Sequence, residues 1–210
     1  FMGKAVILQG VGGRDMTFID CEAGVAPTLA PKRGFVMFSG ETQNTVIKSL
    51  TIQRCRACET NCRPEEEYSS GRYAGGVFFG GSPGGGGGSS ATLFDVLIDR
   101  CQGGGVGAFY VLSGSNPVFE QVSIQETDCP IHVHNAGLTW NGGVVANCTC
   151  GTNSTLIEGV FSSMSITGVT FSNPSPVYHQ TGYPLTWKTP SPSCWEISAD
   201  KMNATNNQCT

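Results

Sequence analysis

The stretch VLIDRC, residues 96–101, recurs along the chain with small changes. Three other segments follow the same pattern, at residues 16–21 (MTFIDC), 50–55 (LTIQRC) and 122–127 (VSIQET), with a weaker copy at residues 169–172 (VTFS) and a degenerate one at residues 143–148 (GVVANC). The copies alternate apolar with polar residues, which is typical of a β-strand with one buried face. The repetition predicts an architecture of similar units stacked on one another.

A second apolar segment, which ends in glycine, accompanies these copies. The second segments lie at residues 5–10, 35–40, 77–81, 108–114 and 131–137. Glycine suits tight turns because it adopts backbone conformations closed to other residues. One repeat is therefore expected to consist of a strand, a glycine turn, a second strand and a loop, with insertions at residues 56–74 and 80–90.

No segment of helical periodicity separates the copies, so a repeat cannot bury its apolar side chains against a helix of its own. It has to stack on the next repeat, and parallel strands about 4.8 Å apart then form inward ladders of like side chains. The ladder residues we expect are Phe18, Ile52, Ile98 and Ile124, together with Phe38, Phe79 and Tyr110. The expected fold class is all-β, a parallel β-helix over residues 1–172.

Residues 75–79 (GGVFF) and 115–124 (SNPVFEQVSI) resemble the right-handed β-helix repeats of the pectin-lyase-like superfamily and of the non-enzymatic surface proteins built on that fold. The resemblance covers roughly residues 4–172, and its motifs are architectural. It implies a right-handed solenoid with loop insertions. A shared fold does not imply a shared activity.

Composition excludes several classes of partner. Charged residues make up only 13% of the 210 residues, and the net charge is −4. No cluster of lysine and arginine is interleaved with aromatic residues, so no nucleic acid is expected as a partner. No run of about 20 apolar residues occurs, so no membrane span is expected. No motif indicates a cofactor.

The ten cysteines, an even number, suit an oxidising compartment, and all are expected in disulfides. They are Cys21, Cys55, Cys58, Cys62, Cys101, Cys129, Cys148, Cys150, Cys194 and Cys209. Cys21, Cys55 and Cys101 share one position in successive repeats, at a spacing that a disulfide can bridge. Two of these three are expected to bond to each other. A metal site is disfavoured because no matching pair of ligands lies at zinc-finger spacing.

Three N-glycosylation sequons begin at Asn147, Asn153 and Asn203. Glycans on asparagine are added to secreted proteins of eukaryotic cells, on surface loops. Together with the cysteines, the sequons predict a secreted protein, extracellular or on the cell surface, that carries N-linked glycans.

Residues 173–210 differ in composition from the rest of the chain. Proline at this density removes hydrogen-bond donors from a strand ladder, so we expect an extended tail pinned by disulfides and no further repeat. The segment resembles the Ser-Pro stretches of hydroxyproline-rich extracellular glycoproteins of algae and plants. The resemblance implies hydroxylation or O-glycosylation at Pro174, Ser175, Pro176, Pro190, Ser191, Pro192 and Ser193.

Charged side chains in successive repeats are the candidates for catalysis. They are Asp20, Arg54, Arg100 and Glu126, which align, with Asp95 and Asp99 nearby. Polysaccharide-cleaving members of the superfamily use carboxylates from adjacent coils, with calcium and an arginine in the lyases or a histidine in the hydrolases, because the reaction needs an acid and a base. Alternating charges at a coil corner are more typical of a structural role. We therefore assign no catalytic residue.

Two histidines, His132 and His134, lie on one face of a predicted strand and point outward if Ile131 and Val133 point inward. A metal site needs a third ligand, and only Asp128 is available nearby. We interpret the pair as two solvated imidazoles.

A solenoid has two ends whose unpaired strand edges invite another chain. The first strand is expected within about five residues of Phe1, with no amphipathic cap ahead of it. The function expected is that of a structural, non-catalytic subunit of an extracellular glycosylated fibre or cell-surface coat, which assembles with itself through its ends and tail. The alternatives are a polysaccharide-active enzyme of pectate lyase or polygalacturonase type and a glycan-binding adhesin, with extracellular polysaccharide as partner.

Overall fold

A computed structural model of the chain describes most of the sequence as β structure. The described residues are 2–22, 32–57, 74–81, 87–103, 106–128, 130–149 and 156–172, together with three short strands further on. These residues form sixteen strands and no helix. Within them there is accordingly no apolar helix of the length needed to cross a membrane.

All strands belong to two sheets in which neighbouring strands run parallel. The nine-stranded sheet contains β1 (Ile7–Gln9), β2 (Phe18–Asp20), β4 (Val46–Gln53), β6 (Thr92–Asp99), β8 (Val118–Glu120), β9 (Ser123–Gln125), β11 (Gly137–Ala146), β13 (Ser163–Ser172) and β15 (Thr186–Lys188). The seven-stranded sheet contains β3 (Phe35–Met37), β5 (Val77–Phe79), β7 (Phe109–Leu112), β10 (Ile131–His134), β12 (Ile157–Val160), β14 (Tyr178–Thr181) and β16 (Ile197–Ser198). The prediction of an all-β chain with parallel strands is confirmed.

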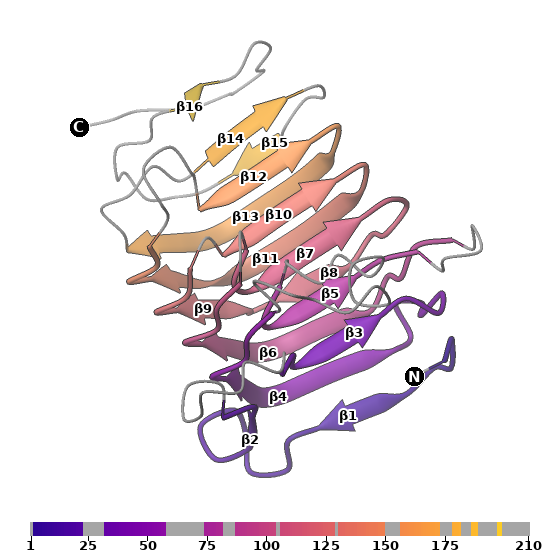
Figure 1. The fold of residues 1–210 in the computed structure, drawn as a ribbon, viewed down its shortest axis with the longest axis vertical. Coiled ribbons are helices and arrows are strands. Elements are labelled where there is room, and N and C mark those ends of the chain that lie inside the picture. Colours follow the sequence, from indigo (N-terminus) through magenta and orange to yellow (C-terminus); the bar gives the residue numbers. More distant parts are fainter. Residues whose placement is uncertain are drawn as a thin grey trace.

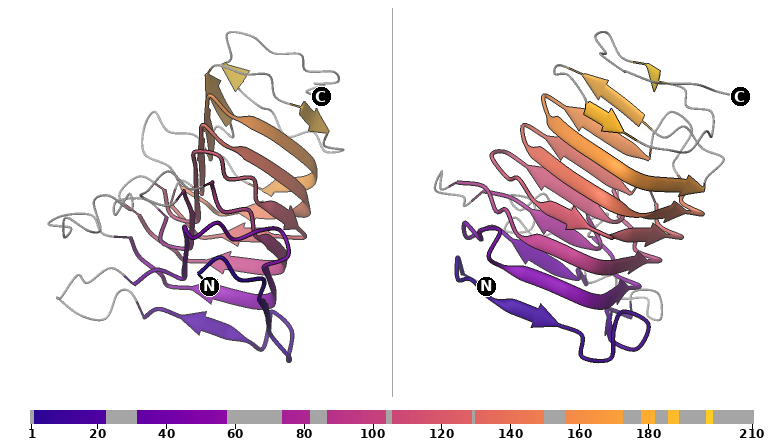
Figure 2. Two further views of the ribbon diagram at one scale, coloured as in Figure 1. Left: turned by 90° about the vertical axis from the view of Figure 1, so that its right-hand side faces the viewer. Right: turned by 180° about the vertical axis from the view of Figure 1, so that it is seen from behind.

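The chain passes from one sheet to the other and back, so that each sheet receives its strands in sequence order. We call one such circuit a winding. The windings follow one another along the long axis of the molecule, from β1 at one end to β14, β15 and β16 at the other (Figures 1 and 2). Contacts between windings therefore join residues that lie far apart in the sequence, as in the pairing of Ile52 with Ile98.

The long strands of the nine-stranded sheet bend at residues in the left-handed backbone conformation. One corner is formed by Ser49, Asp95 and Gln121, with φ of 54°, 51° and 56°, and by Gly142 and Gly168 in later windings. A second corner follows at Arg54, Arg100, Glu126 and Asn147. This conformation costs an L-residue roughly 1 to 2 kcal/mol, so the packing on either side of each corner has to hold it. A winding thus has three straight segments, where the sequence predicted two strands.

At the first corner, glycine is required in at least one winding. Gly143 has a φ of 113°, and a Cβ at this position would lie 1.9 Å from the carbonyl oxygen of Val122. Gly143→Ala is expected to lower the free energy of unfolding by at least about 2 kcal/mol, because backbone strain and a backbone clash add together. Gly87→Ala, where a Cβ meets no atom within 4 Å, is the matched control. Urea unfolding of both variants checks this, and equal midpoints would contradict it.

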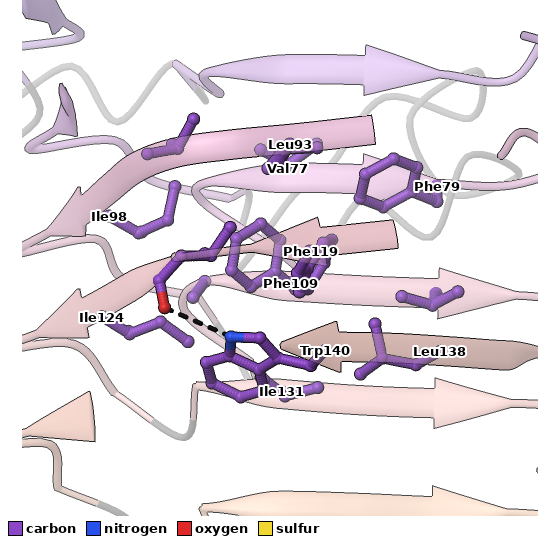
Figure 3. Packing of buried hydrophobic residues seen from close by; sticks show 14 of the residues in the cluster. Val77, Phe79, Leu93, Ile98, Phe109, Phe119, Ile124, Ile131, Leu138 and Trp140 are labelled. Atoms are coloured by element: carbon purple, nitrogen blue, oxygen red, sulfur yellow. Dashed lines mark hydrogen bonds between the residues drawn. The ribbon is translucent and has the colours of Figure 1, made fainter. Parts of the chain in front are cut away.

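The core lies between the two sheets and consists of ladders of apolar side chains. Along the nine-stranded sheet one ladder contains Ile19, Ile52, Ile98, Ile124, Val145 and Phe171. Another aligns Ile47, Leu93, Phe119, Trp140 and Ile166. Figure 3 shows Phe119 in contact with residues of both sheets: its ring centroid lies 4.5 Å from that of Phe109 and 6.1 Å from that of Trp140. Stacked windings therefore share one continuous apolar column.

Three of the predicted ladder residues do not point into the core. Phe18 is 53% exposed, because Ile19, one residue later, pairs with Ile52. Phe38 follows the end of β3 and is exposed, whereas Met37 is buried. The ring of Tyr110 lies on the outer side of the seven-stranded sheet, where it stacks on Phe78. The predictions for Ile52, Ile98, Ile124 and Phe79 are correct, since all four are fully buried.

Two boundaries differ from the prediction. Residues 5–10 were grouped with the segments of the seven-stranded sheet, but β1 pairs with β4 in the nine-stranded sheet. Beyond residue 172, where an extended tail was predicted, β14, β15 and β16 continue the parallel pairing of both sheets. The prolines and serines predicted to be modified lie outside the described residues.

Candidate functional site

A ladder of carboxylates and amides runs across the outer side of the nine-stranded sheet. Asp20, Gln53, Asp99 and Gln125 occupy the same register position in successive windings. Each glutamine donates through Nε2 to the aspartate before it, over 2.8 Å from Gln53 to Asp20 and 3.1 Å from Gln125 to Asp99. Neutral amides thus separate the carboxylates, which avoids placing like charges directly opposite each other. We call this group the outer ladder.

Arginines at the neighbouring corner neutralise both carboxylates of the outer ladder. Nε of Arg54 donates to both carboxylate oxygens of Asp20, over 2.9 and 3.1 Å, and its Nη2 forms a further ion pair. Arg100 donates through Nε to Asp99 over 2.8 Å. Arg54, Arg100 and Glu126 do share one corner position, as predicted, whereas Asp20 stands one position earlier, opposite Gln53. The predicted alignment of Asp20 with the other three is wrong.

The ion pair with Arg54 fixes the protonation state of Asp20. Hydrogen bonds from Arg54 lower the pKa of Asp20 to about 2, against an ordinary value of 3.8, and outweigh the opposite effect of burial. The hydrogen bond to Asp20 likewise raises the pKa of Arg54, and the one to Asp99 raises that of Arg100. At neutral pH the Asp20 carboxyl group therefore has no proton to donate. A general acid for glycosidic cleavage needs the opposite shift.

The low pKa of Asp20 predicts a pH dependence. Since the folded-state pKa lies below the ordinary one, the Asp20–Arg54 pair stabilises the fold fully above about pH 4 and stops doing so as the pH falls through 2. Asp20→Asn is expected to cost up to about 1 kcal/mol at pH 7, because the pair is partly exposed, and nothing below pH 2. Urea unfolding at pH 7, 4 and 2 checks this, with the exposed Asp15→Asn as control. A cost that stays constant across these pH values would refute it.

Asp95 does not join the outer ladder. It occupies the first corner, with φ of 51°, and its carboxylate lies 3.4 Å from Nη1 of Arg14. The six charged residues singled out from the sequence therefore lie in two places and do not converge on one cleft.

The two histidines point outward from the seven-stranded sheet, as predicted, and Ile131 and Val133 beside them are buried. They are not both solvated, however. The ring of His132 stacks on Tyr110 at a centroid distance of 4.8 Å, and its side chain is only 16% exposed. Its Nδ1 lies 3.0 Å from the carboxylate of Glu158 on the next strand. Pairing of the strands could not be read from the sequence, so this neighbour was missed.

No group of three potential metal ligands occurs within the described ranges. Asp128, the third ligand considered for the histidines, accepts a hydrogen bond from the hydroxyl of Thr149 over 3.2 Å. It therefore belongs to another contact between windings.

Sequence reasoning also missed a buried carboxylate, Glu41. It accepts hydrogen bonds from the Ser89 hydroxyl at 2.6 Å, from the N–H of Ser39 at 3.0 Å and from the N–H of Gly3 at 3.3 Å. Burial by itself would raise the pKa of Glu41, but these donors hold it below its ordinary value. The carboxylate joins the N-terminal residues to two later windings, so its arrangement is that of a structural anchor.

Cysteines form one further column, at the second corner. Cys21 and Cys55 form a disulfide with a Cα–Cα distance of 4.8 Å, which confirms that two of the three aligned cysteines bond to each other. Cys101, in the next winding, is a buried free thiol, in contrast to the predicted disulfide. Cys148 is buried in the same column, with its Sγ 3.4 Å from the carbonyl oxygen of Ala146. Cys58, Cys62, Cys129, Cys150, Cys194 and Cys209 lie outside the described residues.

The sequon at Asn147 occupies an exposed corner. Asn147 has a φ of 53°, in the region that asparagine tolerates best after glycine, and its side chain reaches solvent. The other two sequons, at Asn153 and Asn203, fall outside the described residues. The geometry at Asn147 is compatible with attachment of a glycan.

Comparison of the chain with protein-family models, with curated proteins and with solved structures finds no match.

Proposed function

We propose that the chain is a right-handed parallel β-helix and that it serves as a structural, non-catalytic subunit of an extracellular glycosylated fibre or cell-surface coat. The sheet order supports the fold: each winding adds its strands beside those of its predecessor, always in parallel. Crossover connections between parallel strands of one sheet are right-handed in about 98% of cases. This rule supports the proposed handedness.

The chemistry of the described residues supports a structural role outside the reducing cytosol. The Cys21–Cys55 disulfide suits an oxidising compartment. Asn147 offers an exposed position for a glycan. Of the charged residues that could have served catalysis, Arg54 neutralises Asp20 across windings and Arg100 neutralises its sequence neighbour Asp99. Their role in the proposal is to hold neighbouring windings in register.

The observation that carries the proposal is the N-terminal end of the stack, the part of the molecule that contains β1 and β2 (Figure 1). In the described residues both strands pair only with β4, so their outer edges carry unpaired backbone groups. Large apolar side chains are exposed in the same segment, namely Met2, Ile7, Val11, Met16 and Phe18. Unpaired edges beside exposed apolar side chains are the features of a site for adding a further strand.

A second copy of the chain can supply the next winding. Its parallel strands would pair with the free edges of β1 and β2, and its side chains would cover Ile7 and Val11, which are 65% and 96% exposed. Because such a contact joins two different surfaces, repetition of it produces a filament. Glycans at the Asn147 corner would project sideways from the filament and leave the ends accessible.

Electron microscopy and sedimentation of the purified full chain at near-neutral pH test the proposal. We expect filaments at high protein concentration. The double variant Ile7→Lys/Val11→Lys should raise the concentration needed by about tenfold or more, since it removes two apolar contacts of about 1 kcal/mol each and adds repulsion. Phe94→Lys, which replaces an exposed apolar residue on the outer side of β6, is the matched control and should assemble normally. Monomers alone at every concentration would refute the proposal.

A further inference from the structure

Three cysteines lie side by side in three successive windings. Cys21 lies beside Cys55, with the two Cα atoms 4.8 Å apart, and the N–H of Cys21 donates to the carbonyl of Gln53 at 3.1 Å. Cys55 and Cys101 are also direct neighbours: the pairs Gln53–Asp99 and Arg56–Gln102 flank them in the same register, and the N–H of Gln102 donates to the carbonyl of Cys55 at 2.8 Å. Cys55 thus has a cysteine on either side.

Both neighbours of Cys55 lie at a distance that a disulfide can span. The Cα atoms of Cys21 and Cys55 are 4.8 Å apart. In-register residues on adjacent parallel strands are separated by about 4.8 Å, and Cα atoms about 4.4 to 6.8 Å apart can be bridged. The Sγ of Cys101 lies 3.8 Å from the carbonyl oxygen of Ile52, in the winding of Cys55. The thiol therefore points toward the winding that holds the disulfide.

We propose that Cys101 is a second disulfide partner of Cys55, and that the bond between Cys21 and Cys55 can be exchanged for one between Cys55 and Cys101. The thiolate of Cys101 attacks Sγ of Cys55, a new S–S bond forms, and the bond to Cys21 breaks. Cys21 leaves as a thiolate and takes up the proton that Cys101 has lost. The exchange is an isomerisation that consumes no oxidant or reductant.

The exchange moves the covalent link by one winding and releases the first one. Among the described residues, β1 and β2 pair only with β4, each over three residue pairs. Once Cys21 is a thiol, the N-terminal segment is held by noncovalent contacts, which include these short ladders, the hydrogen bonds of Glu41 and the ion pair between Asp20 and Arg54. The isomer with the Cys55–Cys101 bond ties together the windings of β4 and β6 instead, and leaves β1 and β2 without a covalent link to β4. This inference stands independently of whether the chain forms filaments.

Burial restrains the exchange in the folded state. Cys101 is fully buried, and burial raises the pKa of its thiol to about 12. Because the thiolate is the attacking species, the exchange rate should rise about tenfold for each pH unit below that value. The Cys21–Cys55 isomer therefore persists near neutral pH and rearranges at alkaline pH or when the corner opens.

Cys148 provides an internal control. It occupies the same column two windings after Cys101, with its Sγ 3.9 Å from the carbonyl oxygen of Ile124. Its neighbour in the preceding winding is Thr127, whose Oγ1 accepts a hydrogen bond from the N–H of Cys101 at 3.4 Å. Two windings separate Cys148 from Cys101, about twice the strand spacing and too far for a bond.

Peptide mapping without reduction tests the proposed pairing in variants produced in an oxidising compartment. In Cys21→Ser we expect most of the protein to contain a Cys55–Cys101 disulfide. In Cys21→Ser/Cys101→Ser, the matched control, Cys55 should be recovered as a thiol. If Cys55 and Cys101 both remain thiols in Cys21→Ser, or if Cys55 bonds to a cysteine other than Cys101, the proposal is wrong.

A kinetic test uses the unaltered chain and does not depend on the folding of a variant. The protein is incubated at pH 7 or pH 9, quenched in acid, and alkylated under denaturing conditions. Labelling of Cys21 should appear about 100-fold faster at pH 9. Labelling of Cys101 should fall by an equal amount, and labelling of Cys148 should not change. Labelling of Cys21 without loss at Cys101, or labelling that persists in Cys101→Ser, would overturn the inference.

Discussion

Trp140→Ala is expected to lower the free energy of unfolding by about 3 to 5 kcal/mol, the range found when a large buried aromatic side chain is removed from a core. The indole ring is fully buried and packs edge-on against Phe119, at 6.1 Å, and Phe171, at 6.2 Å, in the windings on either side. Its Nε1 donates to the carbonyl of Val122 at 3.2 Å (Figure 3). The substitution leaves a cavity and also removes the only side-chain donor to this carbonyl among the contacts described.

We expect the cavity to weaken the packing of adjacent windings as well, because each aromatic side chain of the column contacts others in the windings beside it. Phe94→Ala is the matched control: it removes a partly exposed aromatic side chain from the outer side of the same sheet and should cost less than about 1 kcal/mol. Chemical denaturation, monitored by far-ultraviolet circular dichroism and not by tryptophan fluorescence, measures both changes in the free energy of unfolding. Similar losses for the two variants would show that the side chains between the sheets do not form the core.

Much of this column could be predicted from the sequence. The alternation in Leu50–Gln53 and Val96–Asp99 identifies Ile52 and Ile98 as inward residues, because a strand with one buried face reverses its side chains at every residue. The repetition of the pattern without helices between copies then requires stacking. Both inferences rest on local periodicity, which the sequence contains in full.

The corners could not be predicted in the same way. Between Ile47 and Leu50 the inward positions are three residues apart, because Ser49 adopts a left-handed conformation and takes the chain round the corner. The same step of three occurs from Leu93 to Val96. Strict alternation continued through the corner exchanges the inward and outward residues on its far side. The segment before the corner is therefore not recognised as a separate straight part of the winding. The recurrence of this step is the signal that could have revealed it.

The error at Phe18 has a related cause. Aligning the cysteines places Phe18 beside Ile52, but Ile52 and Cys55 are separated by two residues and Ile19 and Cys21 by one. The additional residue is Arg54, which forms the left-handed corner, whereas in the first winding the left-handed residue is Glu22, after the cysteine. Hydrogen bonding follows the strands, so Ile19 pairs with Ile52 and Phe18 is left exposed. Residues such as Glu41 and Glu158 were missed because their partners are brought together only by the windings.

Removal of the disulfide in Cys21→Ala/Cys55→Ala is expected to cost about 3 to 4 kcal/mol, since the bond closes a loop of 34 residues and its loss increases the entropy of the unfolded chain. Both cysteines have to be replaced, because Cys21→Ser alone leaves Cys55 free to bond with Cys101 and to keep part of the constraint, now over a loop of 46 residues. Cys148→Ala, which removes a buried sulfur from the same column, is the control for lost packing. Thermal unfolding of the three variants separates the effects: the single Cys21→Ser variant should be the more stable of the two disulfide variants, and equal stability would show that no second bond forms.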